Sequence, residues 1–442
     1  MSDERIDLPL SAQCGTLILE QDGSLVKRSV LPGGVRVLSE EVPSFHSVSI
    51  GMWVGVGSRD EHEGTFGSTH FLEHLLFKGT KNRSSQEIAA RSDYLGGSFN
   101  AATSKQATNY YGHVFEEDLP AAIELLADMV TSATLTREDM DMERGVILEE
   151  LAMYHDDASD VAGEELPRLV FTDDHPLSRP VGGTPESVKA LEHDNLVEHY
   201  RRHYVPNELV VCAAGAVNHE ELCERVYEAL TAKGWELGEG VDAHEPRLVD
   251  DITYGESQER YVERPVEQSA VVVGMPGLRV DDERRTVLYA LSAILGGGQS
   301  SRLFQTVREE RGLAYSTYSF PASYREGGLF ALYGACAPGN ASEVAQLLGE
   351  CLDTMAENGV SAEEVESAYR RVRADIVFGA ERLSSRMNRL ATSELVRTYH
   401  ITRAALLDQA RTVTGEQIQD LARDLAAAPR STVCVGAFGE QK

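Results

Sequence analysis

The stretch that organises this chain is Gly67-Ser-Thr-His70-Phe-Leu-Glu73-His74-Leu-Leu-Phe-Lys-Gly-Thr80. His70 and His74 are four residues apart, so in a helix their imidazoles project from one face, about 5–6 Å from each other. Two nitrogens at that separation can share one Zn²⁺. Glu73 lies beside the same face, where its carboxylate can accept a proton from water without binding the ion itself. The spacing therefore predicts a metal site on a helix.

The alternative interpretation is a surface helix that carries two solvated histidines. The flanking residues argue against it, since they are Phe71, Leu72, Leu75, Leu76 and Phe77 and predict a buried helix. Polar groups in a buried helix cost free energy unless they have partners. A metal ion supplies such a partner, and H-x-x-E-H is the inverted form of the zinc-protease motif.

A second predicted helix, residues 136–154, offers a third ligand. Thr136 and Asp139 are typical of its N-cap, and the acidic helix is expected to continue beyond residue 154 through Asp156, Asp157, Asp160, Glu164 and Glu165. Its segment ERGVILEEL places Glu143 and Glu150 seven residues apart, which is two turns and hence one face. Two histidines with one glutamate are a known zinc ligand set that leaves a position for water. We assign Glu150 as the ligand and Glu143 as a residue that supports the ligands, whereas Glu149 should point away. One Zn²⁺ per chain is expected.

Length and composition limit the remaining possibilities. A chain of 442 residues is expected to form two or three domains. Its formal net charge of −30 argues against nucleic acid as a partner and is compatible with cationic peptides. The N-terminus lacks the features of a signal or transit peptide and no apolar run approaches the length of a membrane span, so a cytoplasmic protein without membrane contact is expected. The six cysteines are scattered and predict reduced thiols.

The second half of the chain repeats the first. The strand-like segment 269–275 resembles 47–53, and residues 360–377 align with 135–151. This alignment sets Ala368 opposite Glu143 and Asp375 opposite Glu150. The second half has no histidine pair at the place that corresponds to His70 and His74. We predict an α+β protein with two homologous domains, each an antiparallel or mixed sheet packed with helices. The ranges are a loose arm at 1–15, a metal-binding domain at 16–232, a linker at 233–251 and a second domain without ligands at 252–442.

Two other patterns have alternative interpretations. His199 and His203 are also four residues apart, but Arg201 and Arg202 flank them and no acid accompanies them, so a solvated or stacking role is favoured. The run Gly296-Gly-Gly298 is typical of phosphate-binding loops, but the lysine of a P-loop is missing, so nucleotide binding is disfavoured. Further on, Arg308 and Tyr315 are a cation and a phenol that can stabilise a developing oxyanion if they reach the metal.

Taken together, these segments resemble the pitrilysin-type zinc metallopeptidases, and most of all the short-chain branch that includes the β subunit of mitochondrial processing peptidase and bacterial proteases of that size. The resemblance runs from about residue 16 to the C-terminus. It is carried by HFLEH followed by FKGT, and by SFNAATSKQATNYYGHV, ERGVILEEL, HPLSRPVGGT and GGGQSSRLFQTVREERGLAYS.

The resemblance implies further site residues. Arg308 and Tyr315 match an arginine–tyrosine pair that this family supplies from its second domain. The segment 98–103 matches the edge strand that receives the substrate as an added β-strand, and the residues concerned are Ser98, Phe99, Asn100, Ala101 and Ala102. Asp160 and Glu164 stand where processing peptidases hold a substrate arginine.

The resemblance also implies an assembly. Two domains form a half-clamshell, so two chains are expected to meet, either as a homodimer or as a heterodimer with an inactive paralogue. The expected activity is zinc-dependent endopeptidase action on peptides or unfolded segments, with Glu73 as the base. The alternatives are a non-catalytic scaffold subunit of the processing-peptidase type and a metal-binding module without chemistry. Processing and general degradation are not distinguished by the sequence.

Overall fold

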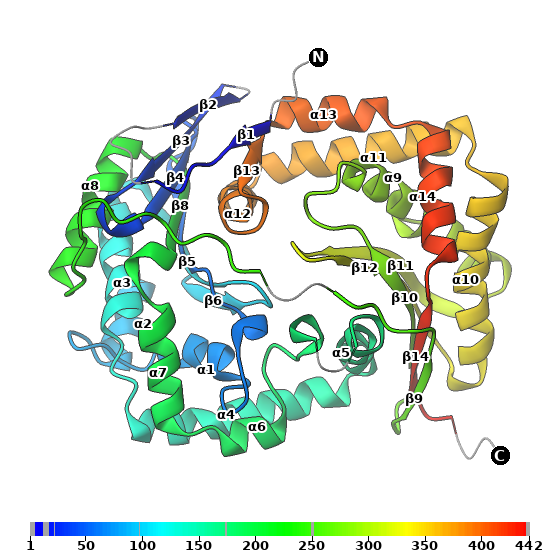
Figure 1. Cartoon of the computed structure of the whole chain (residues 1–442), viewed down its shortest axis with the longest axis horizontal. Coiled ribbons are helices and arrows are strands. Elements are labelled where there is room, and N and C mark those ends of the chain that lie inside the picture. Colours follow the sequence, from blue (N-terminus) through cyan, green and yellow to red (C-terminus); the bar gives the residue numbers. More distant parts are fainter. Residues whose placement is uncertain are drawn as a thin grey trace. The chain divides into compact units, whose positions relative to one another are not determined.

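The computed structural model describes residues 5–11, 17–21, 23–96, 98–172, 175–248 and 252–438. The chain divides into two compact units (Figure 1). The first comprises Met1–Leu151, Pro180–Arg247 and Phe378–Ala404, and the second comprises Ala152–Arg179, Leu248–Val377 and Ala405–Lys442. Each unit is a sheet packed with helices, as the α+β prediction requires.

The first unit is built on a seven-stranded mixed sheet with the order β2-β3-β4-β8-β5-β7-β6. Its strands are β2 (Leu17–Gln21), β3 (Ser24–Val30), β4 (Arg36–Glu41), β5 (Ser47–Val54), β6 (Asn100–Thr103), β7 (Thr108–Phe115) and β8 (Leu209–Gly215). A separate pair joins β1 (Arg5–Asp7) to β13 (Tyr399–Ile401). The helices are α1 (Ser68–Leu75), α2 (Ser85–Tyr94), α3 (Leu119–Ser132), α4 (Arg137–Asp156), α6 (Pro185–Ala190), α7 (His193–His203), α8 (His219–Ala232) and α12 (Leu383–Thr392).

The second unit is built on a five-stranded sheet with the order β11-β12-β10-β14-β9. Its strands are β9 (Glu259–Glu263), β10 (Ser269–Gly277), β11 (Ala314–Ser323), β12 (Gly328–Cys336) and β14 (Ser431–Gly436). Its helices are α5 (Ala158–Val170), α9 (Arg285–Gly296), α10 (Ala341–Asn358), α11 (Ala362–Ala380), α13 (Arg403–Thr412) and α14 (Gly415–Ala427), and a π-helical segment spans Phe304–Glu310.

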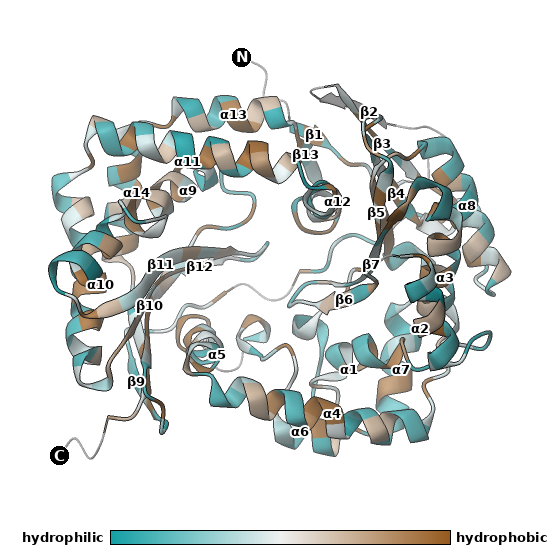
Figure 2. Ribbon diagram, turned by 180° about the vertical axis from the view of Figure 1, so that it is seen from behind, coloured by the Kyte–Doolittle hydropathy of each residue, from teal (hydrophilic) through white to brown (hydrophobic). Residues whose placement is uncertain are grey.

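The central strands are buried along most of their length because helices cover both faces of each sheet (Figure 2). Side chains alternate across a strand. One face of β8 therefore packs in the core with α1 and α3, through Leu209, Val211 and Ala213. Their neighbours Val210 and Cys212 pack on α12. In the second unit, β10 divides its residues in the same way between the core with α9, α10 and α14 and the core with α5.

The compact units differ from two contiguous halves of the chain. Helix α5 follows the metal-binding segment in sequence but packs on β10 and β14 of the second unit, and α12 packs on β8, β5 and β4 of the first. The predicted linker also makes backbone hydrogen bonds within the first unit, for example from the Ala243 N–H to the Leu10 carbonyl at 2.9 Å. Residues 249–251 of that linker and residues 1–4 and 12–15 of the predicted arm lie outside the described residues.

The acidic helix expected to run on beyond residue 154 ends earlier than predicted. Helix α4 ends at Asp156, and the side chain of Asp157 caps a new helix by accepting hydrogen bonds from the N–H groups of Ser159 and Asp160. Asp157 has an extended backbone, as N-cap residues usually do. The break lies close to the boundary between the two units, and α5 belongs to the second.

Within the described ranges, no helix combines the length and the apolar character that crossing a bilayer requires. The five cysteines that the structure describes are free thiols, and Cys14 lies outside the described residues.

Candidate metal centre

Helix α1 is anchored at its N-terminus by a buried carboxylate. Glu61 accepts hydrogen bonds from the N–H groups of Gly67 and Thr69, both at 2.8 Å. These N–H groups have no partner inside the helix, and a negative charge is favourable at this end of the helix dipole. Phe71, Leu72 and Leu75 face the core and fix the rotation of the helix. His70, Glu73 and His74 are thereby left on its partly exposed face.

The structure brings three of the predicted residues together. The Oε2 atom of Glu150 lies 3.3 Å from Nε2 of His74 and 3.8 Å from Nε2 of His70. The three ligand atoms all lie within 4.8 Å of one another, and no other such group of three or more His, Cys, Asp or Glu residues occurs in the part of the chain that the structure describes. Glu150 comes from α4, whereas both histidines come from α1.

These distances fit a zinc ion. Ligand atoms at 2.0–2.2 Å from a tetrahedral centre are separated by about 3.4 Å, which lies between the two nitrogen–oxygen distances. Burial and the neighbouring His74 lower the pKa of His70, so its ring is held in the neutral form that binds metals. The Nδ1 atom of His70 is buried without a hydrogen-bond partner. The other ring nitrogen, Nε2, is the one that faces Glu150.

Glu143 contacts the ligand His74 on the side of its ring away from Glu150. Its Oε2 lies 3.2 Å from Nδ1 of His74, and its Oε1 lies 2.5 Å from Nζ of Lys78. The carboxylate is almost fully buried, at 3% exposure. Lys78 is a residue that the sequence analysis missed, although its position four residues after His74 was a usable signal. Glu149, the neighbour of Glu150, is exposed as expected.

The edge strand β6 reaches the same site. The Thr103 hydroxyl donates a hydrogen bond of 2.5 Å to Oε2 of Glu73, a contact that the sequence did not indicate. The strand begins at Asn100, so the expectation that Ser98 and Phe99 belong to it is wrong; the ring of Phe99 instead lies over Gly112 of β7. Ala101 is buried and Ala102 is exposed, because they point to opposite faces of the sheet.

Gly182, near the end of the segment HPLSRPVGGT, lies next to the ring of His70. A Cβ atom on Gly182 would lie 3.0 Å from Leu151 and 3.6 Å from Nδ1 of His70. The position is therefore too crowded for most side chains. This glycine holds the loop against the His70 ring.

The other predicted site residues belong to the second unit. Arg308 stacks on the Tyr315 ring at 4.6 Å and donates to the Tyr315 carbonyl at 3.0 Å, so the structure brings this pair together. Tyr315 is 73% exposed. Asp160 and Glu164 lie four residues apart on α5 and are both exposed. Burial and the nearby Asp157 raise the pKa of Asp160.

The second histidine pair is not solvated, so that part of its interpretation is wrong. His199 and His203 are buried with ring centroids 4.6 Å apart. Burial lowers their pKa values to about 4 and about 3. His199 lies 3.1 Å from the hydroxyl of Thr69 and so supports α1.

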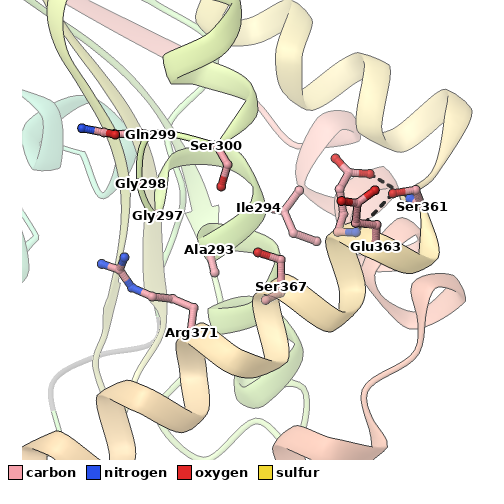
Figure 3. A pocket seen from close by; sticks show the side chains of 12 residues that line it. Ala293, Ile294, Gly297, Gly298, Gln299, Ser300, Ser361, Glu363, Ser367 and Arg371 are labelled. Atoms are coloured by element: carbon pink, nitrogen blue, oxygen red, sulfur yellow. Dashed lines mark hydrogen bonds between the residues drawn. The ribbon is translucent and has the colours of Figure 1, made fainter.

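The glycine run ends α9 and lines a cavity of about 540 Å³ with the first turns of α11 (Figure 3). Glu363, Glu364 and Arg371 all belong to that lining, so charges of both signs are present there. A Cβ on Gly296 would approach the backbone nitrogen of Ser319 to 2.2 Å. Close packing of α9 on β11 therefore explains at least this glycine.

Comparison with known proteins identifies the family. Residues 36–184 match the insulinase (peptidase family M16) model, and residues 190–372 match the peptidase M16 inactive-domain model. The chain is 39% identical to an uncharacterised zinc protease of Streptomyces coelicolor over 432 residues, which are 98% of this chain and 94% of that protein. It is 33% identical to an uncharacterised zinc protease of Bacillus subtilis over 404 residues, 91% of this chain and 96% of that one.

Solved structures show the same fold. A protease from Helicobacter pylori has a TM-score of 0.83 at 20% identity, covering 97% of this chain and 100% of that one. The M16 inactive domain from Pseudomonas fluorescens has a TM-score of 0.84 at 18% identity, covering 94% and 99%. Together, the two family models match most of the chain. The alignments with the two zinc proteases named above cover nearly all of it. The chain therefore belongs to peptidase family M16.

Proposed function

We propose that this chain is a zinc-dependent endopeptidase that hydrolyses peptides or unfolded polypeptide segments. The observation that carries the proposal is the convergence of His70, His74 and Glu150 from two helices, with Glu73 beside them. These three residues would hold the ion. When bound, zinc lowers the pKa of water and polarises a carbonyl group.

The chain's own residues supply the remaining chemistry. Glu73 takes the proton from the attacking water and returns it to the leaving amine. The hydrogen bond from Thr103 restrains one of its oxygens. Glu143, held by Lys78, fixes the His74 ring through Nδ1 and keeps Nε2 directed at the ligand position.

The substrate is proposed to bind as an extended strand on β6. This strand is at the edge of the sheet, and among the described residues it pairs only with β7. Its outer backbone groups can therefore pair with a peptide. The charge of −30 favours cationic peptides on approach.

Other roles rest on the sequence and on its resemblance to the family. Arg308 and Tyr315 are proposed to stabilise the developing oxyanion, and Asp160 and Glu164 to bind basic substrate side chains. A homodimer with one zinc ion per chain, and a cytoplasmic location, are proposals of the same kind.

The test is incubation of the purified protein with a mixed peptide library, with and without a chelator, and identification of cut sites by mass spectrometry. Glu73→Gln should retain stoichiometric zinc and lose turnover, and Glu149→Gln is the matched control because its exposed side chain lies outside the cluster. An active Glu73→Gln protein contradicts the mechanism. Zinc binding without cleavage by the wild-type chain favours a scaffold subunit or a metal-binding module.

A further inference from the structure

A cavity of about 570 Å³ lies within the first unit, between α12 and the end of the sheet that carries the edge strand. Its volume is within the range of roughly 300–1,000 Å³ typical of ligand pockets. The walls come from Trp53 of β5, Tyr111 of β7, Met387 of α12 and Leu395 just after it, and exposed Ala102 of β6 forms part of the lining. The cavity thus reaches the strand proposed to receive substrate.

The alternation of side chains places this cavity on a definite face of the sheet. Ala101 belongs to the core on the α1 side, and Thr103 contacts Glu73 on that side. Ala102 points the opposite way, as do its cross-strand neighbour Asn109 and the next neighbour Trp53. The cavity therefore lies on the face of the sheet opposite Glu73.

A peptide strand paired with β6 would follow the same alternation. Side chains level with Ala101 and Thr103 would lie on the Glu73 side. A side chain level with Ala102 would lie on the other face, with its Cβ about 5 Å from the Ala102 methyl group. That side chain is next to the cavity.

The lining of the cavity is uncharged. None of the described residues that form it is Asp, Glu, Lys or Arg, although the chain as a whole is strongly acidic. The nearby Arg386 and Arg389 of α12 are instead bound to Glu40 of β4. A charged substrate side chain would lose hydration here without gaining a counter-charge. Trp53, Tyr111 and Met387 offer aromatic and adaptable apolar surface. The rest of the lining mixes small apolar residues with the uncharged polar residues Ser104, Gln106, Asn109, Ser384, Asn388 and Thr392.

We propose that this cavity is a specificity subsite that receives an uncharged apolar or aromatic side chain of a peptide paired with β6. The inference rests on the proposed peptidase function and adds the substrate class of one position. It predicts that the preference is confined to alternate positions of the bound peptide, because only every second side chain points to this face of the sheet.

Cleavage of a mixed peptide library by the full-length chain tests the subsite. One position relative to the cut should favour Leu, Met, Phe and Tyr over charged residues by about tenfold. Asn388 lines the cavity and is exposed, so its replacement should not disturb folding. Asn388→Asp should raise acceptance of Lys and Arg at that position by roughly fivefold, and Asn388→Lys should do the same for Asp and Glu.

The control is Gln86→Asp, which adds the same charge on exposed α2 of the same unit. It should leave every position unchanged. The inference is overturned if the Asn388 variants keep the wild-type preference, if they alter all positions alike, or if the wild-type chain shows no apolar preference at any position. Absence of chelator-sensitive cleavage by the wild-type chain contradicts the peptidase function itself and the subsite with it.

Discussion

At the scale of single residues, the metal centre depends on the contacts that its buried carboxylate, Glu143, makes with neighbouring side chains. Glu143 is almost fully buried, and its two oxygens contact His74 and Lys78. A buried carboxylate without such partners would be strongly destabilising. The pairing explains how this side chain is accommodated in a buried position next to a ligand.

Removal of the Glu143 carboxylate should weaken metal binding rather than abolish it. Glu143→Gln keeps the size of the side chain but loses the charge that orients His74 and pairs with Lys78. We expect zinc affinity to fall roughly 10–100-fold, measured by competition with a chromogenic chelator. Glu149→Gln should retain wild-type affinity, and equal affinity in Glu143→Gln would contradict the supporting role.

Thr103 is expected to position Glu73 through its hydroxyl. Thr103→Val removes the donor at nearly constant volume, so kcat should fall by about tenfold or more with little change in KM or zinc content. Thr103→Ser retains the hydroxyl and should recover most of the activity. Unchanged kcat in Thr103→Val, with Glu73→Gln inactive, would show that the contact has no catalytic role.

At the scale of elements, α12 is attached to the first sheet by a buried charge cluster. Glu40 of β4 is fully buried and contacts Arg386, Arg389 and Arg403, the last at 2.6 Å. Burial alone would raise the Glu40 pKa, but the three arginines outweigh it and lower the pKa to about 2. The cluster holds in place the helix that forms one wall of the cavity.

This cluster predicts acid sensitivity. The folded-state pKa is lowered from 4.5 to about 2, so the stabilisation is fully present above the unfolded-state value and is lost as pH falls towards the folded-state value. The difference corresponds to roughly 3 kcal/mol. Urea unfolding at several pH values between about 5 and about 2 should show this loss in the wild-type chain.

Two variants isolate the contribution of Glu40. Glu40→Gln should be less stable at neutral pH by about 3–5 kcal/mol, because it leaves three largely buried arginines without their counter-charge, and it should lack the acid-dependent step. Glu220→Gln removes an exposed carboxylate that pairs with Lys27 and should cost less than about 1 kcal/mol. Identical pH profiles for Glu40→Gln and the wild-type chain would contradict the assignment.

At the scale of the whole molecule, the assembly is a direct prediction. The chain carries both the ligand set and the Arg308–Tyr315 pair, so a homodimer needs no additional subunit. Light scattering on the purified chain should give twice the mass of one chain. A stable monomer that becomes active only with a paralogous chain would favour the heterodimer instead.

Several features of the fold and the site followed from local sequence. The strand-like pattern of residues 47–53 agrees closely with β5 (Ser47–Val54), because periodicity is a property of consecutive residues. Thr136 caps α4 through the Asp139 N–H at 3.1 Å, as its spacing indicated. The break at Asp157 was missed, since an aspartate in an acidic stretch is compatible with both helix and cap.

What the sequence alone determined is the chemistry that is encoded within single helices. The spacing of His70 and His74, and of Glu143 and Glu150, set the faces of α1 and α4 before any packing was known. Only the tertiary structure decided the contact between Thr103 and Glu73 and the pairing of Glu143 with Lys78. It also decided the cavity next to Ala102, and that α5 belongs to the second unit and α12 to the first. These features join residues that are distant in the chain, and their distances depend on how sheets and helices pack rather than on spacing in the sequence.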